Sequence, residues 1–189
     1  MLAHDEVLKL SDTTAFSGMG DSSCDSNTIL TDYCRSFKEG LESVFSGIQF
    51  TPCDGTRMKY LNGNNAGPKP TSYTCLKFPD SSEIFSYIFS KTPSKANTIH
   101  PSGGYIGYLY IDVNGPKKPN TVGRDIFELY IGNNGVVYPS GSQAYSEIMT
   151  NDPNRYYWRT TISNSYKCTT DSYGFGCAGR VLEEGKMDY

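Results

Sequence analysis

Apolar residues recur at intervals of three and four positions in the first quarter of the chain. The residues that follow this spacing are Leu30, Tyr33, Cys34, Phe37, Leu41, Val44 and Phe45. Such spacing gathers apolar side chains on one face of an α-helix. Asn27 or Thr28 can cap its start, and Gly47 follows its end. The pattern predicts an amphipathic helix over residues 28–45. The side chains expected to face a sheet are Leu30, Phe37, Leu41 and Val44.

From residue 73 onward the apolar positions fall into short runs rich in aromatic and β-branched residues. Gly, Pro, Asn and Asp bound these runs, which is typical of β-strands joined by turns. Strands are predicted at residues 73–78, 84–89, 105–113, 126–132, 136–139 and 156–162. Asn133, Asn134 and Gly135 favour a tight hairpin, because Asn and Gly accept positive φ angles. We therefore expect successive strands to form an antiparallel sheet.

The remaining segments lack a sustained period and are predicted to be loops. Residues 1–26 are rich in Ser, Thr, Gly and Asp, and we expect a poorly structured N-terminal segment there. Residues 47–70 contain turn formers and are also predicted to be loop. Residues 145–154 can form a short helix or a loop. The predicted fold class is α+β, with one globular domain over residues 27–189 in which a helix packs on an antiparallel sheet with long loops.

The composition fits one loop-rich domain of 189 residues, with 19 Gly, 10 Pro and 15 Tyr. The net charge is -3, and no stretch concentrates Lys and Arg, which argues against binding of nucleic acid through a broad basic face. No apolar run is long enough to cross a membrane, and no segment has the pattern of a signal peptide. We expect a shortened form of an exported protein, with Met1 as an added start.

Six cysteines form an even set that contains no CxxC pair and has no neighbouring histidine. This arrangement favours disulfides over a zinc site or free thiols, and therefore an oxidising location such as the periplasm, the cell surface or the exterior. Cys168 and Cys177 flank a short turn-rich segment and are the expected local pair. The other predicted pairs are Cys34 with Cys53 and Cys24 with Cys75. Many other connectivities of six cysteines stay open.

The sequence offers little that points to catalysis. Its two histidines, His4 and His100, lie in no nucleophile, metal or acid–base motif. The GxSxG nucleophile elbow and the glycine-rich phosphate loops of nucleotide-binding proteins do not occur. We therefore expect a structural or binding protein that is not an enzyme and has no catalytic cofactor.

One segment, between residues 110 and 141, offers a candidate metal site. Its oxygen-bearing candidate ligands are Asp112, Asn114, Asn120 and Asp125. Such oxygens suit calcium, but their spacing differs from that of an EF-hand, and Lys117, Lys118 and Arg124 place positive charge on the same loop. The favoured interpretation is a turn ordered chiefly by its own hydrogen bonds, with bound calcium as the alternative.

Four stretches of the chain carry a resemblance to a known family. They are YLNG at 60–63, IDVNGPKKPNTVGRDIFELYI at 111–131, NGVVYPSG at 134–141, and an ending that closes with GFGCAGRVLEEGKMDY. Together they resemble the globular domain of bacterial type IV pilin-like proteins, the pilins and pseudopilins made with a prepilin-type cleavage and methylation motif. The resemblance covers residues 28–189. It implies a helix laid against an antiparallel sheet and a disulfide-bounded segment near the C-terminus.

The resemblance also implies a function. Members of this family are structural subunits of type IV pili or type II secretion filaments, anchored in the inner membrane before they assemble with other subunits through an apolar N-terminal helix. This sequence shows neither the basic leader nor that helix, so we expect the soluble domain alone, monomeric by itself. The family implies no catalytic residues, and its pseudopilins often hold calcium in a C-terminal loop.

A free-standing extracellular binding module or adhesin is the alternative function. In that case exposed Tyr and Asn side chains and Trp158 would grip a glycan or a partner protein. Trp158 lies in the aromatic stretch RYYWRT, where packing in the core is the simpler interpretation.

Overall fold

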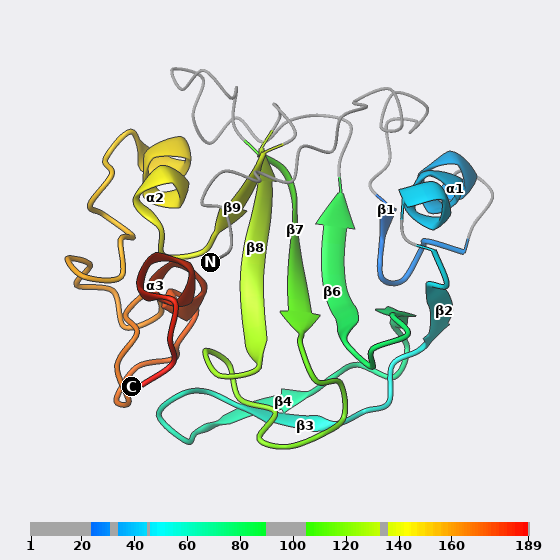
Figure 1. The fold of residues 1–189 in the computed structure, drawn as a ribbon, viewed down its shortest axis with the longest axis horizontal. Helices are drawn as coiled ribbons and strands as arrows, with labels where there is room; N and C mark the ends of the chain where they lie inside the picture. Colours follow the sequence, from blue (N-terminus) through cyan, green and yellow to red (C-terminus); the bar gives the residue numbers. More distant parts are fainter. Residues whose placement is uncertain (1–23, 31–33, 45, 90–104, 133–135, 189) are drawn as a thin grey trace.

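The computed structural model describes residues 24–30, 34–44, 46–89, 105–132 and 136–188. In these segments the main feature is a seven-stranded antiparallel sheet (Figure 1). Its order is β2 (Gln49–Pro52), β5 (Thr74–Lys77), β6 (Glu83–Phe89), β7 (Tyr105–Asp112), β8 (Ile126–Gly132) and β9 (Val137–Pro139), and β1 (Cys24–Asp25) pairs with β6. Mostly antiparallel sheet with a few short helices is compatible with the α+β class.

Five of the predicted strands are confirmed as β5 to β9, with bounds that differ from the prediction by at most one residue. Residues of β8 alternate between buried and half-buried over most of its length, as expected for a strand. On β6, Ile84 and Phe85 belong to two different core clusters, as side chains on opposite faces of a sheet do. The Asn133 to Gly135 hairpin itself lies outside the described residues.

The predicted N-terminal helix is shorter than expected. Helix α1 covers Arg35–Val44, whereas residues 26–30 form a turn. The Asp25 carboxylate accepts hydrogen bonds from the amides of Asn27 and Thr28, which closes this turn instead of a helix. Leu30 is 63% exposed and does not face the sheet.

The side chains that this segment buries differ in part from those predicted to face the sheet. Ile29, which falls outside the predicted apolar stripe, is fully buried in the core, and Leu41 packs against the same cluster. The structure describes the backbone of Phe37 and Val44 but not their side chains, so the prediction for these two side chains is not tested. Helix α1 lies near β1 and β2 (Figure 1), and the described structure does not show it packed across a face of the sheet. The predicted packing of an N-terminal helix on the sheet is therefore not shown.

The prediction of loop over residues 47–70 is wrong. The segment contains β2 and a separate two-stranded sheet of β3 (Arg57–Lys59) and β4 (Asn65–Pro68). Long-range pairing overrides the local turn signals here, because β2 pairs along its whole length with β5. Strand β3 also bonds to the segment before β8, through Lys59 N to Asn120 O at 3.0 Å.

The strand predicted at 156–162 is also wrong. Residues there form turns, in which the amides of Thr160 and Thr161 donate to Tyr157 O. Ile162 is 94% exposed, so the apolar end of this stretch does not contribute to the core. The two remaining helices are α2 (Gln143–Thr150), which overlaps the segment 145–154 predicted as short helix or loop and begins two residues before it, and α3 (Cys177–Glu184), which was not predicted.

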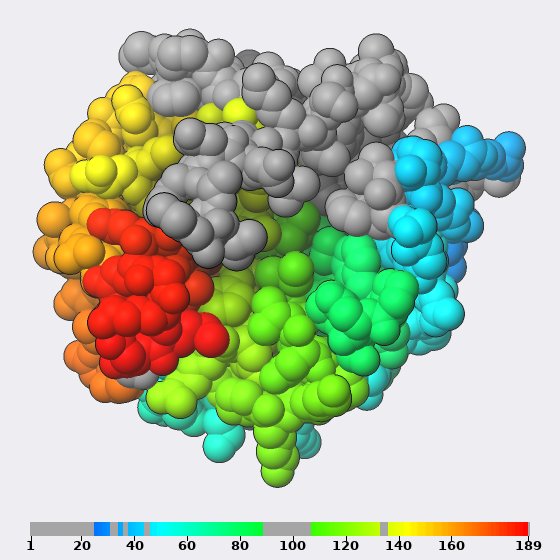
Figure 2. Space-filling view, in the orientation of Figure 1, coloured from blue at the N-terminus to red at the C-terminus, as the bar shows by residue number. Residues whose placement is uncertain are grey.

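The C-terminal segment covers one end of the sheet. Helix α3 contacts β8 and β9, and α2 contacts β9. Helix α3 lies at the surface on the side of the molecule shown in Figure 2. The described helices include none that is long and apolar enough to cross a membrane.

Candidate functional site

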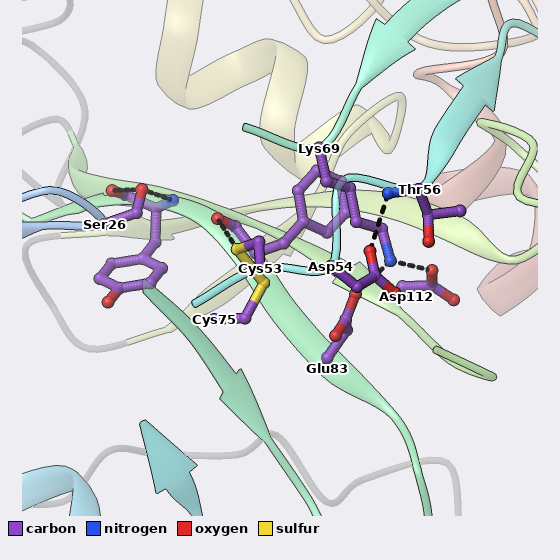
Figure 3. Close-up of a disulfide and its surroundings, with 10 residues drawn as sticks. Ser26, Cys53, Asp54, Thr56, Lys69, Cys75, Glu83 and Asp112 are labelled. Atoms are coloured by element: carbon purple, nitrogen blue, oxygen red, sulfur yellow. Dashed lines mark hydrogen bonds and ion pairs between the residues drawn. A yellow bond between two sulfur atoms is a disulfide. The ribbon is translucent and has the colours of Figure 1, made fainter. Parts of the chain in front are cut away.

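The most unusual group in the described structure is a charged cluster in the interior. Lys69 is fully buried, and so are Glu83 and Asp112, which are 1% and 0% exposed. Lysine is almost never fully buried unless it is paired, so this arrangement requires an explanation. We refer to Lys69, Glu83 and Asp112 as the Lys69 cluster (Figure 3).

The two sheets together position the Lys69 cluster. Lys69 directly follows β4, where its amide donates to Thr56 O at 2.9 Å. Glu83 begins β6, Asp112 ends β7, and these two residues are direct partners across the antiparallel pair. The carboxylates therefore lie side by side on the large sheet, and the lysine reaches them from the small one.

The ammonium group contacts both acids. Lys69 Nζ lies 2.7 Å from Asp112 Oδ2 and also contacts Glu83 Oε1. The ring centroid of Phe85 is 5.1 Å from Nζ and forms an apolar wall. Asp112 Oδ1 accepts from the amide of Asn114 at 3.2 Å. Glu83 Oε2 is buried and accepts no hydrogen bond from any residue in the described part of the chain.

Burial and hydrogen bonds shift the pKa values of Asp112 and Lys69. It raises the pKa of Asp112, and the hydrogen bond and positive charge of Lys69 oppose this shift without cancelling it. Burial alone would lower the pKa of Lys69, but the hydrogen bonds to Asp112 and Glu83 outweigh it, so the pKa of Lys69 is raised. Lys69 therefore stays protonated to a higher pH than a free lysine, and Asp112 takes up a proton at a higher pH than a free aspartate.

A pocket of about 290 Å³ adjoins the Lys69 cluster across Phe85. Its wall is mostly apolar and includes Met58, Tyr60, Tyr110 and Phe175. The aromatic rings pack on one another: Tyr60 and Phe175 are 5.9 Å apart between centroids, and Tyr110 and Phe175 are 6.1 Å apart. Such a pocket can accept an apolar group.

The four candidate calcium ligands all have protein partners. Asp112 pairs with Lys69, and the Asp125 carboxylate accepts from the amides of Asn120 at 2.6 Å and Thr121 at 2.5 Å. With their amide groups oriented to satisfy both polar atoms, Asn114 and Asn120 donate to the carbonyl oxygen of Lys117. Among the described residues no group of three or more His, Cys, Asp or Glu side chains is placed to hold a metal ion. Hydrogen bonds within the loop agree with the favoured interpretation as a turn.

Both partners are defined for two of the disulfides in the described part of the chain. The predicted Cys168–Cys177 pair is confirmed. The second pair is Cys53–Cys75, so the predicted partners of Cys53 and Cys75 were wrong. Cys53 directly follows β2 and Cys75 lies on the neighbouring β5, which brings their Cα atoms within 5.0 Å (Figure 3). Cys34 is also disulfide-bonded, and no described cysteine is free. Such bonds suggest an oxidising environment.

Trp158 is held in a polar network at the surface. Its Nε1 donates to Glu183 Oε2 at 2.9 Å, and the guanidinium groups of Arg159 and Arg180 lie 4.3 and 5.0 Å from its ring centroid. The hydroxyl of Tyr157 also donates to Glu183. We refer to these five residues as the Glu183 network. The indole ring is therefore engaged by side chains of the protein itself.

Sequence reasoning did not single out Lys69 or Glu83. Lys69 lies in the stretch GPKP, which is typical of an exposed turn, and Glu83 directly precedes a predicted strand. His4 and His100 lie outside the described residues. Comparison of the chain with protein-family models, with curated proteins and with solved structures found no match. The pilin-like resemblance is therefore a prediction that these comparisons leave untested.

Proposed function

We propose that this chain is the globular domain of a type IV pilin-like protein, a pilin or pseudopilin, that acts as a structural subunit of a cell-surface or periplasmic filament. The observation that carries the proposal is the disulfide-bounded C-terminal segment, which closes through Cys168–Cys177 and packs α3 on β8 and β9. The resemblance leads one to expect such a segment on an antiparallel sheet.

The sequence stretch with the strongest resemblance also builds the centre of the sheet. Residues 111–131 include the end of β7, the loop between Asp112 and Asp125, and nearly all of β8. In the proposed subunit this hairpin supports a displayed surface, and assembly takes place with other subunits through the N-terminal helix expected of the family. The proposal assigns no catalytic residue.

The proposal is tested by asking whether the chain is a component of filaments on the cells that produce it. Antibodies against the 189-residue chain are applied to source cells, and appendages sheared from those cells are analysed by immunogold microscopy and N-terminal sequencing. We expect label along fibres and a mature N-terminus cut and methylated at a prepilin-type site. A strain that lacks the gene is the control. Recovery of the chain only as a free protein in the medium would refute the proposal.

A free-standing binding module is the second candidate, and the aromatic pocket next to Phe85 favours it. Glycan arrays and a peptide library probe this function with the purified chain. We expect any pocket-dependent binding to be lost in Tyr60→Ala and kept in Tyr157→Phe, which alters a residue outside the pocket. Binding that is equal in both variants would rule out the pocket as the binding site.

A further inference from the structure

The Lys69 cluster is costly as a set of ions. Two carboxylates and one ammonium carry a net negative charge in a region where all three side chains are at most 1% exposed. Removal of such groups from water is unfavourable for each ion, and their mutual attraction offsets this only if every polar atom is satisfied. Glu83 Oε2 accepts no hydrogen bond from the described residues, so the requirement is not met. The arrangement brings an amine and two carboxyl groups together in a dry interior.

We propose that Lys69 and Glu83 condense to form an intramolecular amide bond, with Asp112 carrying the protons. This inference is independent of the proposed function, since it depends only on the contacts of the three side chains.

The reaction balances without any further reagent. Asp112 takes a proton from Lys69 Nζ, and the neutral amine attacks Cδ of Glu83 to form the new carbon–nitrogen bond. Asp112 passes this proton to Oε2, then takes a second proton from Nζ and passes it to the same oxygen. The bond between Cδ and Oε2 breaks, and Oε2 leaves as water. The amide nitrogen keeps one proton, and Asp112 returns to its starting state. Nothing is oxidised or reduced.

The geometry assigns these roles to the two acids. Glu83 Oε1 is in contact with Nζ, and Oε2 is the oxygen that no described group holds, which suits a leaving group. Both Asp112 oxygens are engaged, Oδ2 by Nζ at 2.7 Å and Oδ1 by the amide of Asn114. Asp112 is thus fixed within reach of the protons that must move. The raised pKa of Asp112 suits a group that takes up and releases a proton.

The surroundings favour the condensed product. The ring of Phe85 borders Nζ and the side chains are closed to solvent, so bulk water does not compete with the amine for the carboxyl carbon. Amide formation removes two of the three buried charges and the oxygen without a partner.

The amide bond would covalently join the small sheet to the large sheet at a point where the structure shows an ion pair. Lys69 lies between Cys53 and Cys75, inside the chain segment closed by that disulfide, and Glu83 lies outside it. The amide would therefore tie the end of β4 to the start of β6.

Intact-mass measurement of the folded chain, after reduction and alkylation of its cysteines, tests the proposal. We expect a mass lower by one water molecule than the sequence requires. Trypsin cuts after Lys77 and so separates Lys69 from Glu83, and tandem mass spectrometry should find these two peptides joined. The full sequence mass in the wild-type chain would overturn the proposal whether or not any variant folds.

Variants then test each role. Lys69→Met and Glu83→Ala should show the full mass, and Asp112→Asn should show little or no loss of water, while exposed Lys117→Met should react like the wild type. Circular dichroism checks that each variant is folded. A cross-link that maps to Asp112 in place of Glu83, or complete reaction in Asp112→Asn, would overturn the assigned roles.

Discussion

The Lys69 cluster and the Glu183 network both pair basic side chains with carboxylates, but in opposite surroundings. Lys69 and its two acids are closed to solvent, whereas the side chains of Arg159 and Glu183 are 47% and 43% exposed. Ion pairs at an exposed site contribute up to about 1 kcal/mol, and breaking a buried pair costs about 3 to 5 kcal/mol. Solvent access, more than the number of contacts, therefore decides how much each charged group contributes to the free energy of unfolding.

The largest expected effect is at the Lys69 cluster. Lys69→Met leaves two carboxylates buried without a cation, so we expect a loss of about 3 to 5 kcal/mol in the free energy of unfolding, measured by urea denaturation. Adding Glu83→Gln and Asp112→Asn should recover part of the loss because no charge stays buried. Exposed Lys117→Met is the matched control. A loss below about 1 kcal/mol would show that the buried cluster contributes no more to stability than an exposed ion pair.

The Cys53–Cys75 and Cys168–Cys177 disulfides give the next comparison. The double substitution Cys168→Ser and Cys177→Ser removes a disulfide whose cysteines are 9 residues apart in sequence. We expect the free energy of unfolding to fall by about 2 to 3 kcal/mol. The double substitution Cys53→Ser and Cys75→Ser removes a disulfide whose cysteines are 22 residues apart, and the loss in the free energy of unfolding should be about 1 kcal/mol larger. Urea denaturation of both variants, with the wild type alongside, measures the ranking. The reverse order would show that loop length does not govern these bonds.

At the Glu183 network a single substitution should have a small effect. Glu183→Gln keeps the shape of the side chain and removes the charge that faces Arg159, so we expect a loss of at most about 1 kcal/mol. The loss should shrink at high salt, which screens exposed charges. Thermal melts at low and high salt test this. A loss that is large and independent of salt would contradict the contrast with the interior.

A fall in pH should increase the contribution of Asp112 to stability and decrease that of Glu183. Burial raises the pKa of Asp112, so its contribution to stability falls as the pH rises from 3.8 through the raised value. Partial burial raises the pKa of Glu183, but hydrogen bonds from Trp158 and Tyr157 and the charge of Arg159 outweigh this and lower the pKa. The contribution of Glu183 is therefore present above 4.5 and lost as the pH falls through the lowered value.

Stability profiles from acid to neutral pH measure this difference. Relative to Asp112→Asn, the wild type should gain stability as the pH falls. Relative to Glu183→Gln, it should lose stability over the same change. Parallel profiles for the two variants would show that burial does not separate the two acids.

The smallest expected effect is that of calcium. Because Asp112 already pairs with Lys69 and Asp125 accepts two amide hydrogen bonds, we expect no change in melting temperature between calcium and chelator. A site filled at one hundred times its dissociation constant would add about 2.7 kcal/mol. An upward shift that disappears in Asp112→Ala would establish the calcium alternative.

Strands were predictable where the local pattern and the long-range pairing agree. β8 matches its predicted bounds because its run of apolar and aromatic residues coincides with a strand that is paired on both sides, with β7 and with β9. The start of α1 was missed because Asp25 captures the amides of Asn27 and Thr28, a local choice that the apolar spacing does not reveal. β2 was missed because it is a short edge strand held by its pairing with β5.

The Lys69 cluster could not be predicted from local pattern. Glu83 and Asp112 lie 14 and 43 residues from Lys69 along the chain, and only the meeting of the two sheets brings them together. A lysine between two prolines has the same appearance in sequence whether it ends in solvent or in the core. The Cys168–Cys177 pair was predictable because its two cysteines are close in sequence and flank turn formers.

The two edges of the large sheet bear on how copies of this domain behave when crowded. Among the described strands, β2 and β9 are the two ends of the main strand order, and they are 4 and 3 residues long. Each ends in a proline, Pro52 or Pro139, which has no amide hydrogen to offer to a neighbouring strand. Short edges interrupted by proline resist the strand-to-strand addition that leads to aggregation. When copies of the domain are close together, β2 and β9 therefore disfavour continuation of the sheet from one copy into the next.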